Sequence, residues 1–217
     1  MLVLRASLLL FVAVVVHAAE IPLTVGSRLE LVNAKVETTT HRGATAFAMS
    51  EKDPGPNQAF AIVKDLPFHD GTIEVEVSGA PSKTADATAR GFIGVAFRMA
   101  ADQSRYEMIY IRPSNGRADD QLMRNHSTQY VSAPDWPWQR LRKETPGQYE
   151  SYVDLQPGEW ARMRIVVKGT DASLFVGEAS QPCLVVHNMK LGDSRGAVAL
   201  WIGPGTEGYF RGLKISQ

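Results

Sequence analysis

Gly71-Thr72-Ile73-Glu74-Val75-Glu76-Val77 is the stretch of sequence that decides the fold class. Ile73, Val75 and Val77 alternate with two glutamates, so in an extended chain the apolar side chains share one face and the carboxylates share the other. The preceding Asp70-Gly71 pair is a turn signal. The stretch therefore predicts a β-strand with one face buried and the other in water.

The same alternation recurs along most of the chain, and no segment keeps apolar residues at helical spacing for three turns. Lys168-Gly169-Thr170-Asp171 separates two such segments and marks a hairpin. Many short strands with no helices to cover a parallel sheet predict an all-β fold, two antiparallel sheets packed as a sandwich. The further predicted strands are Lys35–Thr40, Thr45–Met49, Ala59–Val63, Phe92–Met99, Tyr106–Arg112, Tyr149–Leu155, Trp160–Lys168, Ser173–Val176, Leu184–His187 and Val198–Ile202.

The N-terminus has the layout of a secretory signal peptide over residues 1–19. Arg5 precedes an apolar run, 8–16, that ends in small residues, and cleavage could follow Ala18 or Ala19. A retained membrane anchor is the alternative, but the run is shorter than the roughly 18 apolar residues that a span requires. We therefore expect a single β-sandwich domain over 20–217, secreted or periplasmic, with no membrane span after the signal is removed.

The charge and the cysteine content limit the ligands and the cellular compartment that we expect for this protein. Loss of Arg5 with the leader lowers Lys+Arg from 23 to 22, against 23 Asp+Glu, so nothing favours binding to nucleic acid. Cys183 is the only cysteine, which excludes an internal disulfide and a cysteine-based metal site. Export without disulfides fits a bacterial envelope or secreted protein.

One region, 113–147, departs from the strand pattern because it is polar and irregular, and loops of this length are usually functional or disordered. Eight of the fifteen arginines fall between Arg90 and Arg142. The region also holds two tryptophans, Trp136 and Trp138, beside Pro134 and Pro137. Because a disordered segment would be poor in aromatic residues, we expect it to pack over the sandwich as a functional loop. The alternative is a salt-bridged surface flap without a ligand.

The pleat of the strands predicts a shared outer face for this loop to cover. If Ile93, Val95 and Phe97 enter the core, Gly94, Ala96 and Arg98 turn outward; in the next strands Tyr106, Met108, Tyr110 and Arg112, and then Glu150, Tyr152 and Asp154, also turn outward. Small residues on the floor with arginines, tyrosines and a carboxylate at the walls have the composition of a sugar-binding cleft. Trp160 and Trp201 lie on strands and are expected in the core.

The candidate ligand-binding residues come from this face and from the loop. They are Arg98, Tyr110, Arg112, Asp119, Asp120, Arg124, Asn125, Gln129, Tyr130, Trp136, Trp138, Arg142, Glu150 and Tyr152. If the protein is an enzyme, Glu150 or Asp120 would be the acid or base, and His126 is a further candidate because an imidazole titrates near neutral pH. Glycoside hydrolysis would need two carboxyls about 5 to 9.5 Å apart, a demand that Glu150 with Asp119 or Asp120 could meet.

No metal site or cofactor is predicted, because the histidines show no paired ligand spacing. Asp119-Asp120 could help bind calcium through carboxylate oxygens, although adjacent acids are common on solvated loops.

Several short motifs carry a resemblance over about 68–215. They are Asp70-Gly71-Thr72-Ile73-Glu74-Val75, Gly94-Val95-Ala96-Phe97-Arg98, Tyr110-Ile111-Arg112-Pro113, Gly158-Glu159-Trp160, Gly196-Ala197-Val198-Ala199-Leu200-Trp201 and Gly208-Tyr209-Phe210-Arg211-Gly212-Leu213. The chain resembles the concanavalin A-like lectin/glucanase superfamily, in particular secreted bacterial domains of the 3-keto-disaccharide hydrolase-like or laminin-G-like kind. The resemblance implies a jelly-roll sandwich whose concave sheet handles carbohydrate.

The resemblance leaves the activity open. Laminarinase-like enzymes of this superfamily carry Glu-x-Asp-x-x-Glu on one strand, and here Glu74-Val75-Glu76 is the nearest acidic pair and lacks the third acid. The leading hypothesis is therefore an exported protein that binds, or hydrolyses by another design, a glycan or glycoside. The alternative is a non-catalytic envelope domain that docks a protein partner through its arginines and tryptophans. The oligomeric state stays open.

Overall fold

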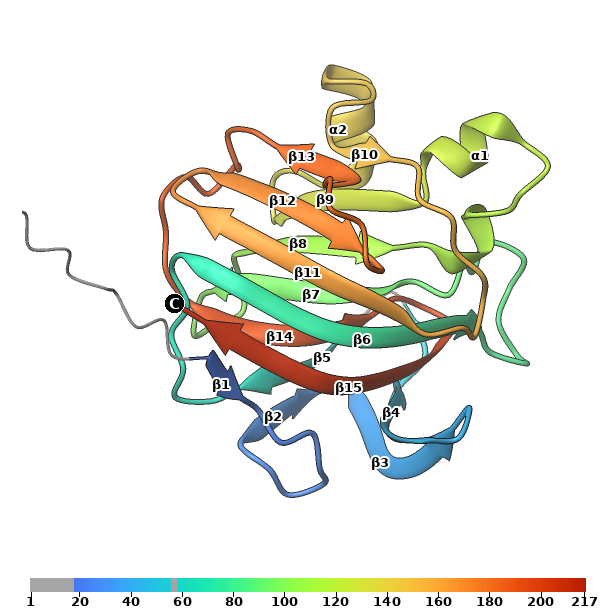
Figure 1. Cartoon of the computed structure of the whole chain (residues 1–217), viewed down its shortest axis with the longest axis vertical. Helices are drawn as coiled ribbons and strands as arrows, with labels where there is room; N and C mark the ends of the chain where they lie inside the picture. Colours follow the sequence, from blue (N-terminus) through green and yellow to red (C-terminus); the bar gives the residue numbers. More distant parts are fainter. Residues whose placement is uncertain (1–17, 56–57) are drawn as a thin grey trace, which may run out of the picture.

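Two antiparallel β-sheets packed face to face make up the structure, a computed structural model that describes residues 18–55 and 58–217 (Figure 1). The eight-stranded sheet has the order β13 (Leu184–Val186), β12 (Asp171–Val176), β11 (Ala161–Lys168), β6 (Gly71–Pro81), β15 (Thr206–Ser216), β4 (Ala44–Glu51) and β3 (Ala34–His41), with β1 (Ala18–Glu20) also on β15. The seven-stranded sheet has the order β10 (Glu150–Ser151), β9 (Thr128–Ala133), β8 (Tyr106–Ile111), β7 (Ile93–Met99), β14 (Ala197–Ile202), β5 (Ala59–Val63) and β2 (Leu29–Val32). The predicted fold class is confirmed.

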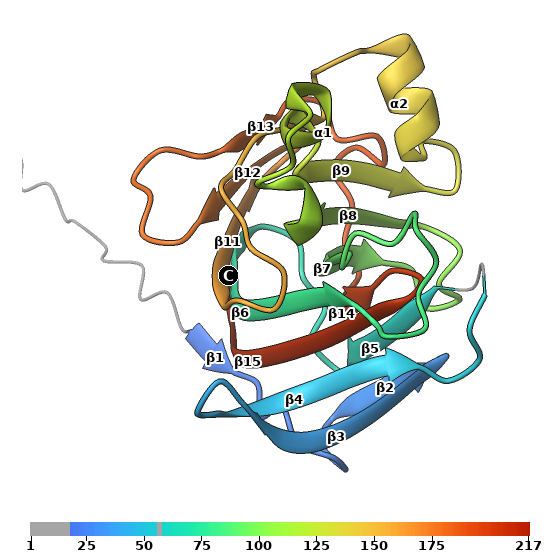
Figure 2. The same cartoon turned by 90° about the vertical axis from the view of Figure 1, so that its right-hand side faces the viewer.

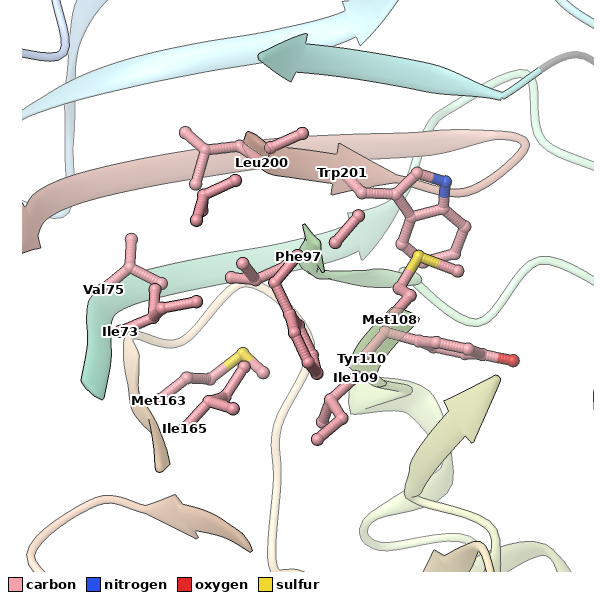
Figure 3. Close-up of a cluster of buried hydrophobic side chains, with 14 of the residues drawn as sticks. Ile73, Val75, Phe97, Met108, Ile109, Tyr110, Met163, Ile165, Leu200 and Trp201 are labelled. Carbon is pink, nitrogen blue, oxygen red and sulfur yellow. The ribbon is translucent and has the colours of Figure 1, made fainter. Parts of the chain in front are cut away.

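The core lies between the sheets, where the predicted alternation places it. Ile73 and Val75 of β6 pair with Ile165 and Met163 of β11, and all four side chains are fully buried. Figure 3 shows these side chains facing the inward residues of the seven-stranded sheet, Phe97, Ile109 and Leu200. Burial of each such aliphatic or aromatic side chain contributes roughly 1.5–3 kcal/mol, so this interior can hold the sandwich without a disulfide.

Three short helices lie near one end of the seven-stranded sheet. They are η1 (Pro113–Asn115), α1 (Gln121–Asn125) and α2 (Trp138–Glu144). Figure 2 shows α1 and α2 at the end of the molecule where β9 and β13 lie. The Asp120 carboxylate caps α1 by accepting a hydrogen bond from the Met123 amide at 2.9 Å. In the part of the chain that the structure describes, no helix has the length and apolar character needed to cross a membrane.

The prediction of an irregular loop over 113–147 is wrong at its centre. Besides the three helices, the region contains β9, which lies in the sheet between β8 and β10. β9 is buried on both faces except at its last residue, so it lacks the alternation of polar and apolar residues that revealed the other strands. The region therefore contributes a strand to the sheet as well as covering its end.

One other strand prediction needs correction, and further strands were missed. Of the predicted strand Tyr149–Leu155 only Glu150–Ser151 pairs, because the chain leaves β9 after two residues. The long strand β15 was not predicted as a strand: Gly208 and Gly212 interrupt its apolar pattern, and its pairing with β6 shifts register between Arg211 and Lys214. The short edge strand β2 was also missed.

Most of the predicted leader, 1–19, lies outside the described residues. Its last two residues, Ala18 and Ala19, belong to β1 and pair with Ser216 and Ile215 at the end of β15.

Candidate functional site

A row of residues across four strands forms the floor of a groove on the outer face of the seven-stranded sheet. Phe60 of β5, Trp201 of β14, Gly94 of β7 and Tyr110 of β8 are successive cross-strand partners. A Cβ at Gly94 would lie 2.4 Å from the Ile109 carbonyl oxygen and 2.5 Å from the Cα of Tyr110. Because Gly94 has no side chain, the rings of Tyr110 and Trp201 approach each other to 4.9 Å between centroids.

Figure 3 shows Met108, Tyr110 and Trp201 on the side of the sheet opposite to the core residues. The groove above them, called here the aromatic groove, has a volume of about 990 Å³. Its apolar surface includes Phe60, Phe92, Tyr106, Met108, Tyr110 and Trp201. Trp138, which is 38% exposed, forms part of a wall. Its polar edge includes Asn33, Lys52, Asp53, Gln58, Asp102 and Ser104.

Beyond Tyr110 the outer face becomes polar. Arg112 is buried, and its guanidinium donates hydrogen bonds to the Tyr110 hydroxyl (2.8 Å), to Gln129 Oε1 (3.2 Å) and to the His126 carbonyl (2.9 Å). Gln129 is fixed in turn by donating to the carbonyls of Tyr130 and Tyr149. Burial lowers the pKa of Arg112 and raises that of Tyr110. The network joins the aromatic groove to the end of the sheet.

A second cavity of about 530 Å³, called here the polar pocket, lies at that end. It is lined by Asn125 and His126 from the end of α1, Arg142 from α2, and Glu150, Ser151 and Tyr152 from β10 and the residue after it. The Glu150 side chain is only 6% exposed. Its Oε2 accepts hydrogen bonds from Arg142 Nε (3.1 Å) and Nη2 (2.7 Å) and lies 2.7 Å from His126 Nδ1.

Burial sets the protonation of His126. It lowers the pKa of the imidazole below its ordinary 6.5, and the Glu150 carboxylate opposes that effect while the Arg142 and Arg112 guanidiniums add to it. The net shift favours the neutral form of the imidazole. A neutral imidazole beside a carboxylate is a group that can accept a proton.

The structure divides the predicted site residues into separate groups. Tyr110 and Trp138 line the aromatic groove. Asn125, His126, Arg142, Glu150 and Tyr152 line the polar pocket, and Arg112 and Gln129 connect the two. Arg124 lies at the edge of the pocket, where its guanidinium contacts the Tyr152 ring and hydroxyl. Of the three catalytic candidates, Glu150 and His126 come together, whereas Asp120 caps α1.

Arg98 does not share this face, so its predicted position is wrong. The pairing of β7 with β14 shifts register at this point, and Arg98 adopts a positive φ of 53° in the bulge. Its fully buried guanidinium bonds the carbonyls of His69 and Gly192 and the Asp70 carboxylate, each at 2.9 Å. One extra residue in a strand reverses the face of those that follow it.

Tyr130 also lies on the wrong side of the sheet for a ligand. It pairs with Ile109 and points inward, where its hydroxyl donates to Glu107 at 2.6 Å and accepts from the Lys190 amide. Burial raises the pKa of both Tyr130 and Glu107. Tyr130 and Glu107 together hold the 187–193 loop in place, since Glu107 also accepts a hydrogen bond from the Leu191 amide.

Trp136 and Asp119 lie outside both cavities. Trp136 packs against the core, with the Arg140 guanidinium 3.8 Å from its ring centre and Lys190 Nζ 4.5 Å away. Asp119 is exposed beside Asp120. Since Asp120 is engaged as the cap of α1, the two acids form no cluster with a third ligand in the described residues.

A group with metal-binding potential in the described chain lies elsewhere, at His69, Asp70 and Asp193. Arg98 already occupies it, with Nη2 at 2.9 Å from Asp70 and 3.7 Å from Asp193. The guanidinium supplies the positive charge that a cation would bring, so the cluster is explained as an ion-pair network.

Sequence reasoning missed most of the aromatic groove. Trp201 is buried, as predicted, but on the outer face, where its indole donates to Gln58 Oε1 at 2.6 Å. Trp160, also predicted in the core, is only half-buried on the outer face of the opposite sheet, beneath Arg211. Phe60 gave no signal because β5 is apolar throughout. Tyr106 and Met108 were placed outward by the pleat and could have been added to the site on that ground.

No protein-family model matches the chain, and no curated protein matches its sequence. Solved structures share its fold. The carbohydrate-binding module CBM66 from Bacillus subtilis has a TM-score of 0.59 at 11% identity, covering 87% of this chain and 95% of that chain. A Bacillus subtilis protein of unknown function with a galectin-like fold has a TM-score of 0.52 at 10% identity, covering 87% and 89%.

The exoplasmic/lumenal domain of VIP36 in a Ca²⁺/Man-bound form has a TM-score of 0.54 at 9% identity, covering 92% of this chain and 88% of that chain. At these identities the similarity shows the fold alone. The chain therefore has a two-sheet β-sandwich fold that these solved structures share.

Proposed function

We propose that this chain is a glycan-binding protein that receives sugar rings in the aromatic groove. The observation that carries the proposal is the combination of an apolar, ring-rich floor with a polar edge in a cavity of about 990 Å³. Aromatic rings offer apolar faces to the C–H surface of a sugar, and amide, hydroxyl and carboxylate groups at the edge bond its hydroxyls.

The fold neighbours support this proposal by what their names state. One is a carbohydrate-binding module, and another was solved with Man bound. Since a shared fold hosts many functions, the proposal rests on the chemistry of the groove, and the names of the neighbours add support to it. Within the superfamily, we place the chain with the 3-keto-disaccharide hydrolase-like or laminin-G-like secreted domains on the motifs in its sequence.

Binding, and not glycoside hydrolysis, is the function we propose for the groove. Hydrolysis needs one carboxyl that stays protonated as an acid. Of the two acids at the polar edge, Asp102 accepts hydrogen bonds from the amide and hydroxyl of Ser104, which lower its pKa. In the polar pocket, Glu150 is the single carboxylate among the described lining residues.

Docking of a protein partner is the competing function, and the arginines argue against it. The predicted anchors are already engaged: Arg142 bonds Glu150, Arg140 bonds Glu144, and Arg112 is buried. A hollow surface with few free cations suits a small polar ligand better than a flat interface.

Export is part of the proposal and rests on the pattern of residues 1–19. Secretion or periplasmic placement would bring the groove to extracellular glycans. Mass spectrometry of the exported protein tests this: an N-terminus at Ala19 or Glu20 supports it, and retention of Met1 contradicts it.

A glycan array followed by titration calorimetry tests the binding. We expect the wild-type chain to bind one class of oligosaccharide and Trp138→Ala to weaken it at least about tenfold, the loss typical of an exposed aromatic anchor. Tyr209→Ala, which removes a ring from the outer face of the eight-stranded sheet, is the matched control and should bind normally. Absence of binding on the array, or equal losses in the two variants, would contradict the proposal.

A further inference from the structure

We propose that the polar pocket is a hydrolytic site, in which His126 acts as a general base, oriented by Glu150, toward acyl esters carried by a glycan in the aromatic groove. The choice of a glycan ester as substrate rests on the proposed function. The assignment of the base rests on the geometry of the pocket.

The geometry is that of a carboxylate–imidazole pair. Glu150 is held by two hydrogen bonds from Arg142, so its Oε2 has a fixed position 2.7 Å from His126 Nδ1. The backbone of His126 is fixed as well, because its carbonyl accepts from Arg112 (2.9 Å) and from Asn115 (3.2 Å). A base that is oriented from both sides can act on a substrate with little rearrangement.

The free nitrogen of this imidazole is available. Nδ1 lies 2.7 Å from Glu150 Oε2 in a charge contact outside hydrogen-bond geometry, and Nε2 makes no hydrogen bond to any residue that the structure describes. Burial lowers the pKa of the ring and so favours its neutral form, and in the tautomer that keeps its proton on Nδ1, toward the Glu150 carboxylate, Nε2 carries a lone pair. His126 lines a cavity of about 530 Å³, which leaves room for water and a substituent.

The pocket and the aromatic groove are neighbours. Trp138 in the wall of the groove and Arg142 in the pocket stand one turn apart on α2, with the guanidinium 4.8 Å from the indole ring centre. Arg112 links them beneath, by bonding both the Tyr110 hydroxyl and the His126 carbonyl. A sugar in the groove can therefore direct a substituent into the pocket.

Ester hydrolysis is the reaction that these groups suit. His126 Nε2 takes a proton from water while the water oxygen bonds to the acyl carbon, and the carbonyl π pair moves to the carbonyl oxygen. The resulting oxyanion is stabilised by Arg142 Nη1, the guanidinium nitrogen that does not bond Glu150. The oxyanion then collapses, the bond from the acyl carbon to the sugar oxygen breaks, and the imidazolium returns its proton to that oxygen. The products are a carboxylic acid and a sugar hydroxyl, and water is the single co-reactant.

The activity is measured with two substrates. Acetylated xylo-oligosaccharides should release acetate, and 4-nitrophenyl acetate should release nitrophenol. We expect His126→Ala to lower kcat/KM about 10²- to 10⁴-fold, the range of a lost general base, and added imidazole to restore part of the rate. His187→Ala is the matched control: His187 lies 3.2 Å from Asp171, but both side chains are exposed and neither lines the aromatic groove or the polar pocket.

Glu150→Gln separates orientation from folding. The charged groups that face His126 are Glu150 from β10, Arg142 from α2 and Arg112 after β8. Arg124 of α1 and the titratable hydroxyl of Tyr152 lie at the edge of the pocket. Because the carboxylate raises the pKa of His126, its loss should move the acidic limb of the rate profile to lower pH and lower the plateau about 10²-fold.

Three outcomes would overturn the inference: no ester hydrolysis by the wild-type chain, equal rates in the His126→Ala and His187→Ala proteins, or an unshifted acidic limb in Glu150→Gln. Glycan affinity is measured in the same variants. If oligosaccharides still bind and no acetate is released, the hydrolytic site is refuted while the proposed function stands.

Discussion

The two outer faces of this sandwich are built on opposite plans. On the eight-stranded sheet the outward residues of β6 and its neighbours are charged and paired across strands, as in Arg162 with Glu74 (2.5 Å) and Arg211 with Glu76 (2.8 Å). On the seven-stranded sheet β7 and β8 are buried on both faces. An antiparallel sheet normally leaves one face polar and in water, so the face that breaks this rule marks the candidate site.

Removal of an indole from each face should give the largest difference. Trp201→Ala opens a cavity beside Tyr110 and leaves Gln58 without its donor, so we expect a loss of about 3–5 kcal/mol in the free energy of unfolding. Trp160 lies on the opposite face and is only half-buried, so Trp160→Ala should lower the free energy of unfolding by about 1 kcal/mol. Urea denaturation measures both, and equal losses would mean that the two faces are equally solvated.

Removal of a guanidinium from each face should give a smaller difference. Arg112→Met leaves Tyr110, Gln129 and the His126 carbonyl without a buried donor, for which we expect a cost of about 1–3 kcal/mol. Arg162→Met removes a partly exposed pair, so we expect it to cost less stability than Arg112→Met. Urea denaturation tests this: the Arg112→Met protein should unfold at a lower urea concentration than the Arg162→Met protein. The reverse order would contradict the claim that burial makes the Arg112 bonds more important.

A pH above 10 should reveal a still smaller difference in stability between the two faces. Burial raises the pKa of Tyr106 above 10, so the folded chain keeps a proton that the unfolded chain loses. The stability that this provides is complete below pH 10 and is lost as the pH rises through the folded-state pKa. Tyr106→Phe should therefore flatten the decline of stability above pH 10.

Tyr209 on the other face supplies the control. Its pKa is raised by burial and, in addition, by the carboxylates of Glu207 and Glu37. Because salt screens exposed charges, added salt should weaken the alkaline effect at Tyr209 and leave that at Tyr106 unchanged. An equal response of both tyrosines to salt would count against the difference between the faces.

The same contrast explains what could be predicted from the sequence. β6 was predicted because Glu74 and Glu76 face water, and the fold class followed from strands of this kind. β9 was not, since Gln129 and Tyr130 are buried on opposite faces and leave no alternation. Burial on both faces is thus the reason that the sequence pattern failed near the site.

The candidate site was predicted in part, and the misses have local causes. Pairs within one short segment were placed together correctly, as with Tyr110 and Arg112. Arg98 was misplaced because a bulge is a single inserted residue without a pattern of its own. Trp201 was assigned to the core since its partner across the strand, Gly94, which opens the groove, is distant in sequence.

Nuclear magnetic resonance of the tryptophan indole groups, during titration with a bound oligosaccharide, tests the central claim most directly. Trp138 and Trp201 line the aromatic groove, whereas Trp160 lies on the opposite face. The account predicts that the indole N–H signals of Trp138 and Trp201 shift on binding and that the signal of Trp160 stays in place. Saturable binding that moves the Trp160 signal and leaves Trp138 and Trp201 unchanged would contradict it.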